Sequence, residues 1–185
     1  MAIKKLIEVA LPLEKINEAS IKERYSHSGH PFQLHLYWAR RPISAARAVI
    51  WASLVDDPSS HPEMFPMEEA QNEERQRLFG ILERLVAWEN NGNVEILNAA
   101  KTEIAKSTNN NPPAMIDPFA GGGALPLEAY RLGLKANAHD LNPVAVMINK
   151  AMIEIPARFK NLPPVNPDAK NFIDDKTNWH GATGL

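Results

Sequence analysis

The stretch that decides the fold reads Met115-Ile116-Asp117-Pro118-Phe119-Ala120-Gly121-Gly122-Gly123, a short apolar run that ends in an acid and continues into glycines. Residues 124–132 then have the pattern of a helix, and residues 135–140 that of a second short strand that again ends in an acid. Residues 143–153 have the pattern of a further helix, which begins at Pro143. Alternating strands and helices of this length are typical of a parallel sheet. The sequence therefore predicts an α/β unit over residues 113–156.

The glycines and the two acids of this unit predict a binding site for a nucleotide-like ligand. Glycines let the backbone approach a ligand closely, and Asp117 at the end of its strand can accept a hydrogen bond from a charged amine. Asp140 follows Asp117 by 23 residues, close to the spacing at which an acid binds ribose hydroxyls in doubly wound folds. The nicotinamide dinucleotide fingerprint is not matched, because Pro126 stands at its third glycine position.

The run from Asp117 to Gly123 resembles the first motif of the S-adenosylmethionine-dependent amino-methyltransferases, Asp-Pro-Phe-x-Gly-x-Gly. The resemblance implies S-adenosylmethionine as cofactor and an α/β fold, an incomplete Rossmann-like methyltransferase domain with an N-terminal helical region and an inserted helical hairpin. Asp140 would hold the ribose hydroxyls, and Leu141 and Asn142 would flank adenine. The residues implied around the methionine half are Asp117, Pro118, Phe119, Ala120, Gly121 and Gly123.

A second motif lies upstream and reads Leu34-His35-Leu36-Tyr37-Trp38-Ala39-Arg40-Arg41-Pro42. Basic residues before a proline at a helix start place cations beside free amide hydrogens, where an anion or a cofactor carboxylate can bind. We therefore assign Arg41 and Pro42 to the cofactor site. Arg40 and Arg47 are expected to contact nucleic acid.

This upstream stretch resembles the motif that precedes the glycine motif in many DNA methyltransferases, with Arg41 in place of their lysine. It is more closely similar to the N-terminal domain of unknown function 1156 of adenine-specific DNA methyltransferases. Packing is expected to account for Tyr37 and Trp38, with base stacking as the alternative. The segments that carry the resemblance are residues 6–14, 29–31, 34–36, 38–42, 47–49, 57–58 and 117–156.

The motif that accepts the hydrogens of the target amine, Asp or Asn-Pro-Pro-aromatic, has no complete counterpart in the sequence. Asn111-Pro112-Pro113-Ala114 lacks the aromatic residue and is typical of a linker. We therefore expect no catalytic residue here, and an N-terminal, cofactor-binding part of an adenine-specific DNA methyltransferase that is inactive alone. A restriction or phage-defence setting follows from the resemblance.

The partners expected are DNA, bound through the complete enzyme, and a downstream catalytic segment or partner subunit. Two alternatives remain open. One is a fragment of an RNA methyltransferase, and the other is a non-catalytic subunit that binds the cofactor or a partner.

Composition places the chain among ordinary globular proteins. It has 185 residues, 44% of them apolar, a formal net charge of -2 and no cysteine, which excludes zinc ribbons and iron-sulfur sites. The sequence shows no membrane span and no signal peptide, so we expect a cytoplasmic protein without membrane contact. We expect no metal site, because turn and capping roles account for the histidines at positions 27 and 30.

The sequence before the linker predicts helices. Within residues 6–25 we expect an extended entry that leads into a helix, and Pro42 is expected at the first position of a helix that reaches Leu54. Residues 67–89 are expected to form an acidic helix, and Asn93 is expected to cap the helix that follows. Residues 1–50 carry eight basic and four acidic side chains, whereas residues 51–110 carry five and eleven. The predicted segments are an N-terminal segment 1–60, an acidic helical hairpin with its linker 61–112, the cofactor-binding unit 113–156 and an irregular proline-rich tail 157–185.

Overall fold

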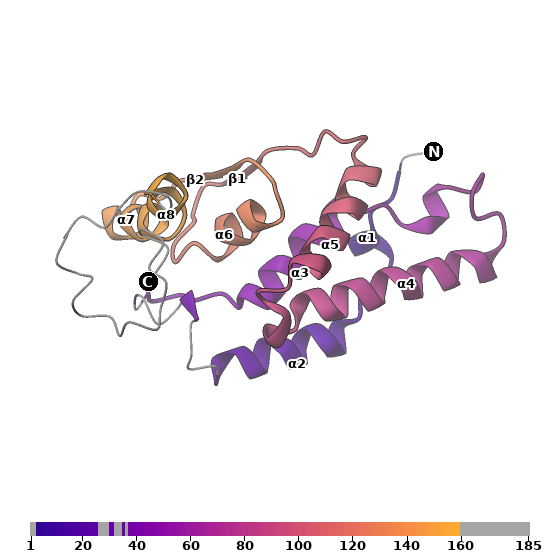
Figure 1. Ribbon diagram of the computed structural model, residues 1–185, viewed down its shortest axis with the longest axis horizontal. Helices are drawn as coiled ribbons and strands as arrows, with labels where there is room; N and C mark the ends of the chain where they lie inside the picture. Colours follow the sequence, from indigo (N-terminus) through magenta and orange to yellow (C-terminus); the bar gives the residue numbers. More distant parts are fainter. Residues whose placement is uncertain (1–2, 26–29, 32–34, 36, 160–185) are drawn as a thin grey trace, which may run out of the picture.

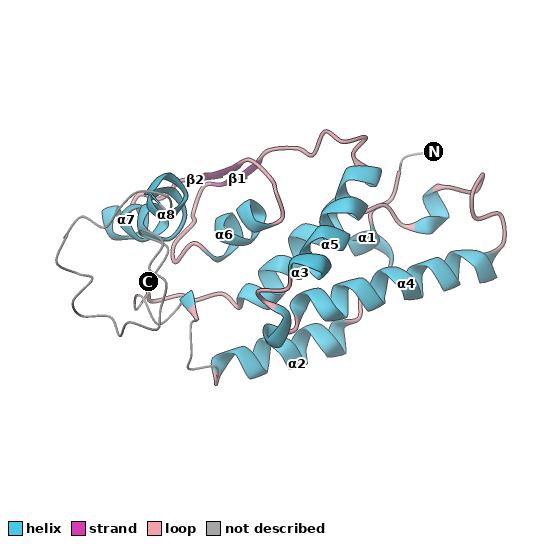
Figure 2. Cartoon of the chain, viewed as in Figure 1, coloured by secondary structure: helices cyan, strands magenta, loops and turns pink. Residues whose placement is uncertain are grey.

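The structure is a computed structural model that describes residues 3–25, 30–31, 35 and 37–159. Helices dominate it, and two short strands lie near one end (Figure 2). The elements are α1 (Leu6–Val9), α2 (Leu13–Arg24), α3 (Ile43–Leu54), α4 (Glu68–Val86), α5 (Val94–Ser107), β1 (Met115–Asp117), α6 (Ala124–Arg131), β2 (Ala136–Ala138), α7 (Pro143–Asn149), a π-helical segment (Lys150–Glu154) and α8 (Ile155–Phe159), with short 3-10 turns at Pro58–Ser60 and Trp88–Asn90.

Helix α3 is the centre of the molecule, because α1, α2, α4, α5 and α6 all contact it (Figure 1). Its sequence is mostly apolar, and Trp51 is completely buried while its indole donates a hydrogen bond to the carbonyl of Ala100 at 3.0 Å. A single buried cluster runs from Leu6 through Leu82 to Leu134. The first three predicted segments therefore share this cluster, and Ile43, Ala46 and Ala124 form a second, smaller one.

Strands β1 and β2 are parallel, with Met115 opposite Ala136 and Asp117 opposite Ala138. Helix α6 connects them and contacts both strands and α3, so it lies between the sheet and the helical part (Figure 1). The predicted mixed α/β class is confirmed, in a chain that is mostly helical. The Rossmann-like extension of this small sheet remains a prediction.

Several predicted elements are confirmed within a few residues. The acidic helix spans Glu68–Val86, and the side chain of Asn93 caps α5 by accepting from the amides of Glu95 and Ile96 at 3.0 and 3.2 Å. Among the described residues, no helix is both long and apolar enough to cross a membrane.

The structure differs from the predictions at two places near the ends of the described residues. The entry before α2 is the short helix α1 rather than an extended segment, because Glu8 accepts a hydrogen bond from the amide of Lys5 at 2.9 Å and caps the turn. The helical run continues through α8 to Phe159, where an irregular tail was expected from residue 157. Residues 160–185 lie outside the described residues.

A buried ion pair joins α3 to α6. Arg47 and Glu128 are 3% and 0% exposed, and the Nε of Arg47 donates to a carboxylate oxygen of Glu128. The other guanidinium nitrogens of Arg47 donate to the carbonyl of Leu85 and the side chain of Asn91, both at 2.6 Å. Arg131 adds a second hydrogen bond to Glu128 at 3.0 Å. All of these groups are therefore satisfied without water.

We predict that Arg47→Met lowers the free energy of unfolding by about 3 kcal/mol, because it leaves the carboxylate of Glu128 buried with only one cation. The control is Lys15→Met, which removes the partner of Glu18 in an ion pair whose two side chains are both about half exposed, and it should cost much less. Urea unfolding followed by circular dichroism measures both. Equal stability of Arg47→Met and the unaltered chain would contradict the central role of the pair.

A smaller charge cluster holds the N-terminal residues. Lys5 bonds to one oxygen of Asp56 at 2.6 Å, and His61 bonds to the other oxygen at 3.0 Å and to Glu63 at 3.1 Å. The hydrogen bond to Asp56, and then the one to Glu63, raises the pKa of His61 above its usual value of 6.5. Protonated His61 is therefore favoured in the folded state.

His61 should accordingly stabilise the fold in acid more than in base. Its contribution is complete below the unfolded pKa and is lost as the pH rises through the raised folded pKa. The difference in unfolding free energy between the chain and His61→Gln should be larger at about pH 6 than at about pH 8.5. A difference that stays constant over this interval, in urea titrations at matched ionic strength, would refute the assignment.

Candidate functional site

A cavity of about 330 Å³ lies where the two sequence motifs meet. From the segment before α3 come Tyr37, Ala39 and Arg41. From the α/β unit come Asp117, Phe119, Ala120, Gly121, Gly122, Gly123, Ala124, Leu125 and Asp140. The fold thus brings most of the predicted cofactor residues to one place, although Arg41 and Asp117 are far apart in the sequence.

Four of the predicted cofactor residues do not line this cavity. Pro118 is exposed in the loop, and Pro42 directly precedes α3 as its N-cap rather than as its first residue. Leu141 is 95% exposed. The side chain of Asn142 caps α7 by accepting from the amide of Val144 at 3.0 Å. The structure therefore gives Asn142 a structural role, and its position beside adenine remains a prediction.

The glycine loop is shaped by contacts within the chain. Gly121 and Gly123 have positive φ angles of 49° and 80°. A Cβ on Gly121 would lie 3.0 Å from the ring of Tyr37, and a Cβ on Gly123 would lie 2.7 Å from the Oδ1 of Asn149. We expected these glycines to admit a ligand, whereas their missing side chains already make room for Tyr37 and Asn149.

Asp140 ties the end of the second strand to this loop. Its Oδ2 accepts a hydrogen bond from the amide of Gly121 at 2.8 Å, and its Oδ1 accepts one from the amide of Asn142 at 2.8 Å. The backbone hydrogen bonds from Asn142 and Gly121 lower the pKa of Asp140. The ionised carboxylate keeps further lone pairs, so it can still accept hydrogen bonds from hydroxyl groups of a ligand.

Asp117 faces the cavity from the end of β1. Its Oδ1 accepts a hydrogen bond from the amide of Phe119 at 3.0 Å, which fixes the carboxylate at the start of the loop. Arg41 is exposed and lines the same cavity. The site therefore combines one cationic side chain with two carboxylates, an arrangement that suits a ligand with both charges and with hydroxyl groups.

The expected anion site at the start of α3 is occupied by the protein itself. Glu23 of α2 is buried and accepts from the amides of Ile43 and Ser44 at 2.7 and 2.9 Å, as well as from the hydroxyl of Ser44 at 2.7 Å. His30 bonds to the same carboxylate at 2.9 Å and stacks on Trp88. No sequence motif marks Glu23, because its partners at the start of α3 are 20 and 21 residues away.

The two residues that were predicted to contact nucleic acid, Arg40 and Arg47, differ in their exposure. Arg47 is buried in its ion pair with Glu128 and offers no surface to DNA, so its assignment to a nucleic-acid interface is wrong. Arg40 is exposed. Burial, and then the charge of Arg40, lowers the pKa of His35. His35 is therefore favoured in its neutral form.

The two aromatic residues of the upstream motif also differ. Tyr37 is partly buried against the glycine loop, as the packing prediction expected. Trp38 is 98% exposed, so the packing prediction is wrong for this residue.

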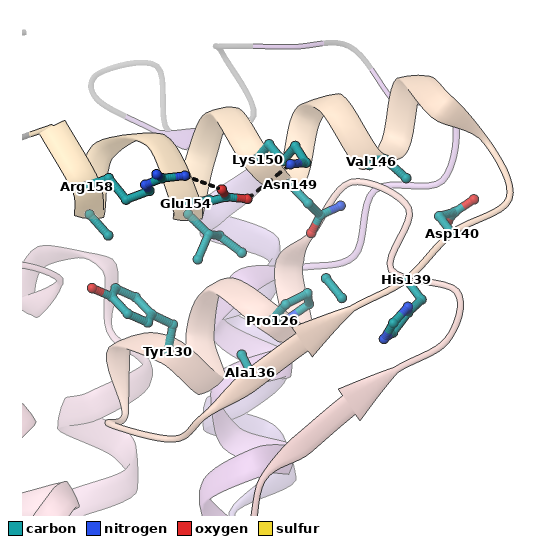
Figure 3. A pocket seen from close by; sticks show the side chains of 13 residues that line it. Pro126, Tyr130, Ala136, His139, Asp140, Val146, Asn149, Lys150, Glu154 and Arg158 are labelled. Carbon is teal, nitrogen blue, oxygen red and sulfur yellow. Dashed lines mark hydrogen bonds and ion pairs between the residues drawn. The ribbon is translucent and has the colours of Figure 1, made fainter.

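A second cavity, of about 400 Å³, opens between α6, β2 and the helices from α7 to α8, and the sequence did not predict it (Figure 3). Glu154 lies on its wall between Lys150 and Arg158, with ion-pair distances of 3.3 and 3.0 Å. Tyr130 lines the cavity from α6, and Asp140 lines both cavities. The two openings therefore adjoin at the end of β2.

Gly123→Ala should destabilise the fold by about 2 kcal/mol, because the residue has a positive φ and its Cβ would collide with Asn149. Gly122→Ala is the matched control. Its Cβ would lie 3.5 Å from its nearest neighbours and its φ is not positive, so its effect should stay within about 1 kcal/mol. Thermal or urea unfolding would reject this interpretation if the two variants were equally stable.

Comparison with known proteins gives one partial match. Residues 10–81, less than half of the chain, match the family described as "Protein of unknown function (DUF1156)". No curated protein and no solved structure matches the chain. The matched region contains α2, α3 and the upstream motif, and it ends within α4.

Proposed function

We propose that this chain is the cofactor-binding part of an S-adenosylmethionine-dependent, adenine-specific DNA methyltransferase. One observation carries the proposal: a single cavity collects Arg41 of the upstream motif, the glycine loop and the two carboxylates Asp117 and Asp140. The family match covers the upstream motif and not the glycine loop. The choice of DNA over RNA rests on the resemblance of residues 38–42, and a restriction or phage-defence setting rests on the same resemblance.

The residues present fit the charges of this cofactor. The positively charged amino group of the cofactor can donate a hydrogen bond to the carboxylate of Asp117. The guanidinium of Arg41 can bind the negatively charged carboxylate of the cofactor. Asp140 stays ionised and can accept from both ribose hydroxyls. The cavity volume lies near the lower end of the range for small-molecule sites.

When bound, S-adenosylmethionine supplies an electrophilic methyl group on its sulfonium. The contribution of this chain is to hold and orient the cofactor, and orientation can account for a large share of a rate enhancement. The sequence contains no Asp or Asn-Pro-Pro-aromatic motif to accept the hydrogens of adenine's amine. We therefore assign that task to a downstream segment or a partner subunit and expect no methyl transfer from these 185 residues alone.

The exposure of the sheet supports the proposal that a downstream segment or a partner subunit packs against it. Parallel sheets are almost always covered on both faces, and among the described helices α6 is the one that packs extensively on this sheet. Ile116 at the centre of β1 is 66% exposed, and Phe119 in the adjoining loop is 78% exposed. Further strands or helices would bury these side chains.

Calorimetry tests the proposal directly. The chain should bind S-adenosylmethionine, and Arg41→Gln should weaken binding about tenfold through loss of a charge-assisted hydrogen bond. Asp140→Ala should weaken it at least as much, since it removes the hydroxyl acceptor and releases Gly121. Arg84→Gln changes another exposed arginine, on α4 and outside the cavity, and should bind normally. No binding by the unaltered chain, or unchanged affinity in both site variants, would remove the proposal.

A further inference from the structure

The segment before α3 presents two different faces. Tyr37, Ala39 and Arg41 all line the cavity, at every second position. Trp38 and Arg40, the residues between them, are both exposed and do not line it. Every second residue therefore serves the proposed cofactor site, and the intervening residues form a separate outward surface at its rim.

Trp38 is the most exposed large apolar side chain among the described residues, at 98%. By contrast, Trp51 is completely buried in the core and Trp88 packs against His30. An indole left in water gains nothing for the fold, because burial of apolar surface is what stabilises it. The exposed indole at the rim of a ligand cavity therefore has a ring face that is available for stacking on another planar group.

The charges around Trp38 favour a polyanion as the molecule that carries this group. Arg40 and Arg41 follow it directly, and residues 37–42 contain no acid. An aromatic ring beside arginines is the combination that binds unpaired bases together with their phosphates.

We propose that Trp38 is a stacking platform for an unpaired nucleobase of the nucleic-acid substrate, with Arg40 placed to contact an adjacent phosphate. The inference extends the proposed function, because it names the surface on which the target strand lies next to the cofactor cavity. A methyltransferase that modifies a base must take that base or its neighbours out of the stack, so unpaired bases are present at such a site.

The test uses the whole chain and a fluorescein-labelled, single-stranded 12-nucleotide DNA that contains adenine, with binding followed by fluorescence anisotropy. Trp38→Ala should weaken binding about tenfold, whereas Trp38→Phe keeps an aromatic face and should stay within about threefold. Val94→Ala truncates another well-exposed apolar residue, at the start of α5, and should bind normally. Arg40→Gln should reduce the salt dependence by about one counterion, equally for unrelated sequences.

Several outcomes would overturn the inference. The first is that the unaltered chain does not bind the DNA, and the second is that Trp38→Ala binds it with unchanged affinity. The third is that Trp38→Ala changes self-association but not DNA binding, which would indicate a protein partner. Calorimetry with S-adenosylmethionine on the same preparations separates the two proposals. Trp38→Ala should bind the cofactor normally, because Trp38 does not line the cavity. If Trp38→Ala loses DNA binding and the unaltered chain does not bind the cofactor, the stacking role of Trp38 is supported and the proposed function is rejected.

Discussion

The buried ion pair between Arg47 and Glu128 fixes the geometry on which the candidate site depends. It joins α3 to α6, and both helices begin at the site, since α3 follows Arg41 and α6 follows Gly123. Near the same ends, the first residues of α3 pack against Ala124. The distance between the two motifs is thus set by a helix-to-helix contact in the interior and not by the loops themselves.

Glu23 provides the second constraint. A carboxylate from α2 occupies the amides at the start of α3, so the protein supplies internally the anion that a free helix N-terminus attracts. This arrangement leaves the cation of Arg41 available to the cavity. The glycine loop is also held by side chains from outside it. Asp140 accepts a hydrogen bond from the amide of Gly121, and Asn149 donates one to the carbonyl of Gly121 at 3.0 Å. The site is therefore organised by groups outside both motifs.

Local features of the fold could be predicted from the sequence, and long-range ones could not. The stripe along α4, the cap at Asn93 and the acid at the end of β1 are patterns within a few residues, and the structure contains them. The burial of Arg47 depends on a partner 81 residues away, and a basic residue on an apolar helix gives no sign of it. The exposure of Trp38 was missed for a related reason, because composition favours burial of aromatic residues whatever the surface around them.

The central claim is that one ligand contacts both motifs at once, and hydrogen-deuterium exchange measures this most directly. In the presence of saturating S-adenosylhomocysteine, the demethylated cofactor, we expect slower amide exchange in peptides covering residues 37–42, 117–125 and 138–142. Peptides of α5, residues 94–107, lie outside the cavity and should exchange as before. Protection confined to other parts of the chain, or no protection at saturation, would contradict the account.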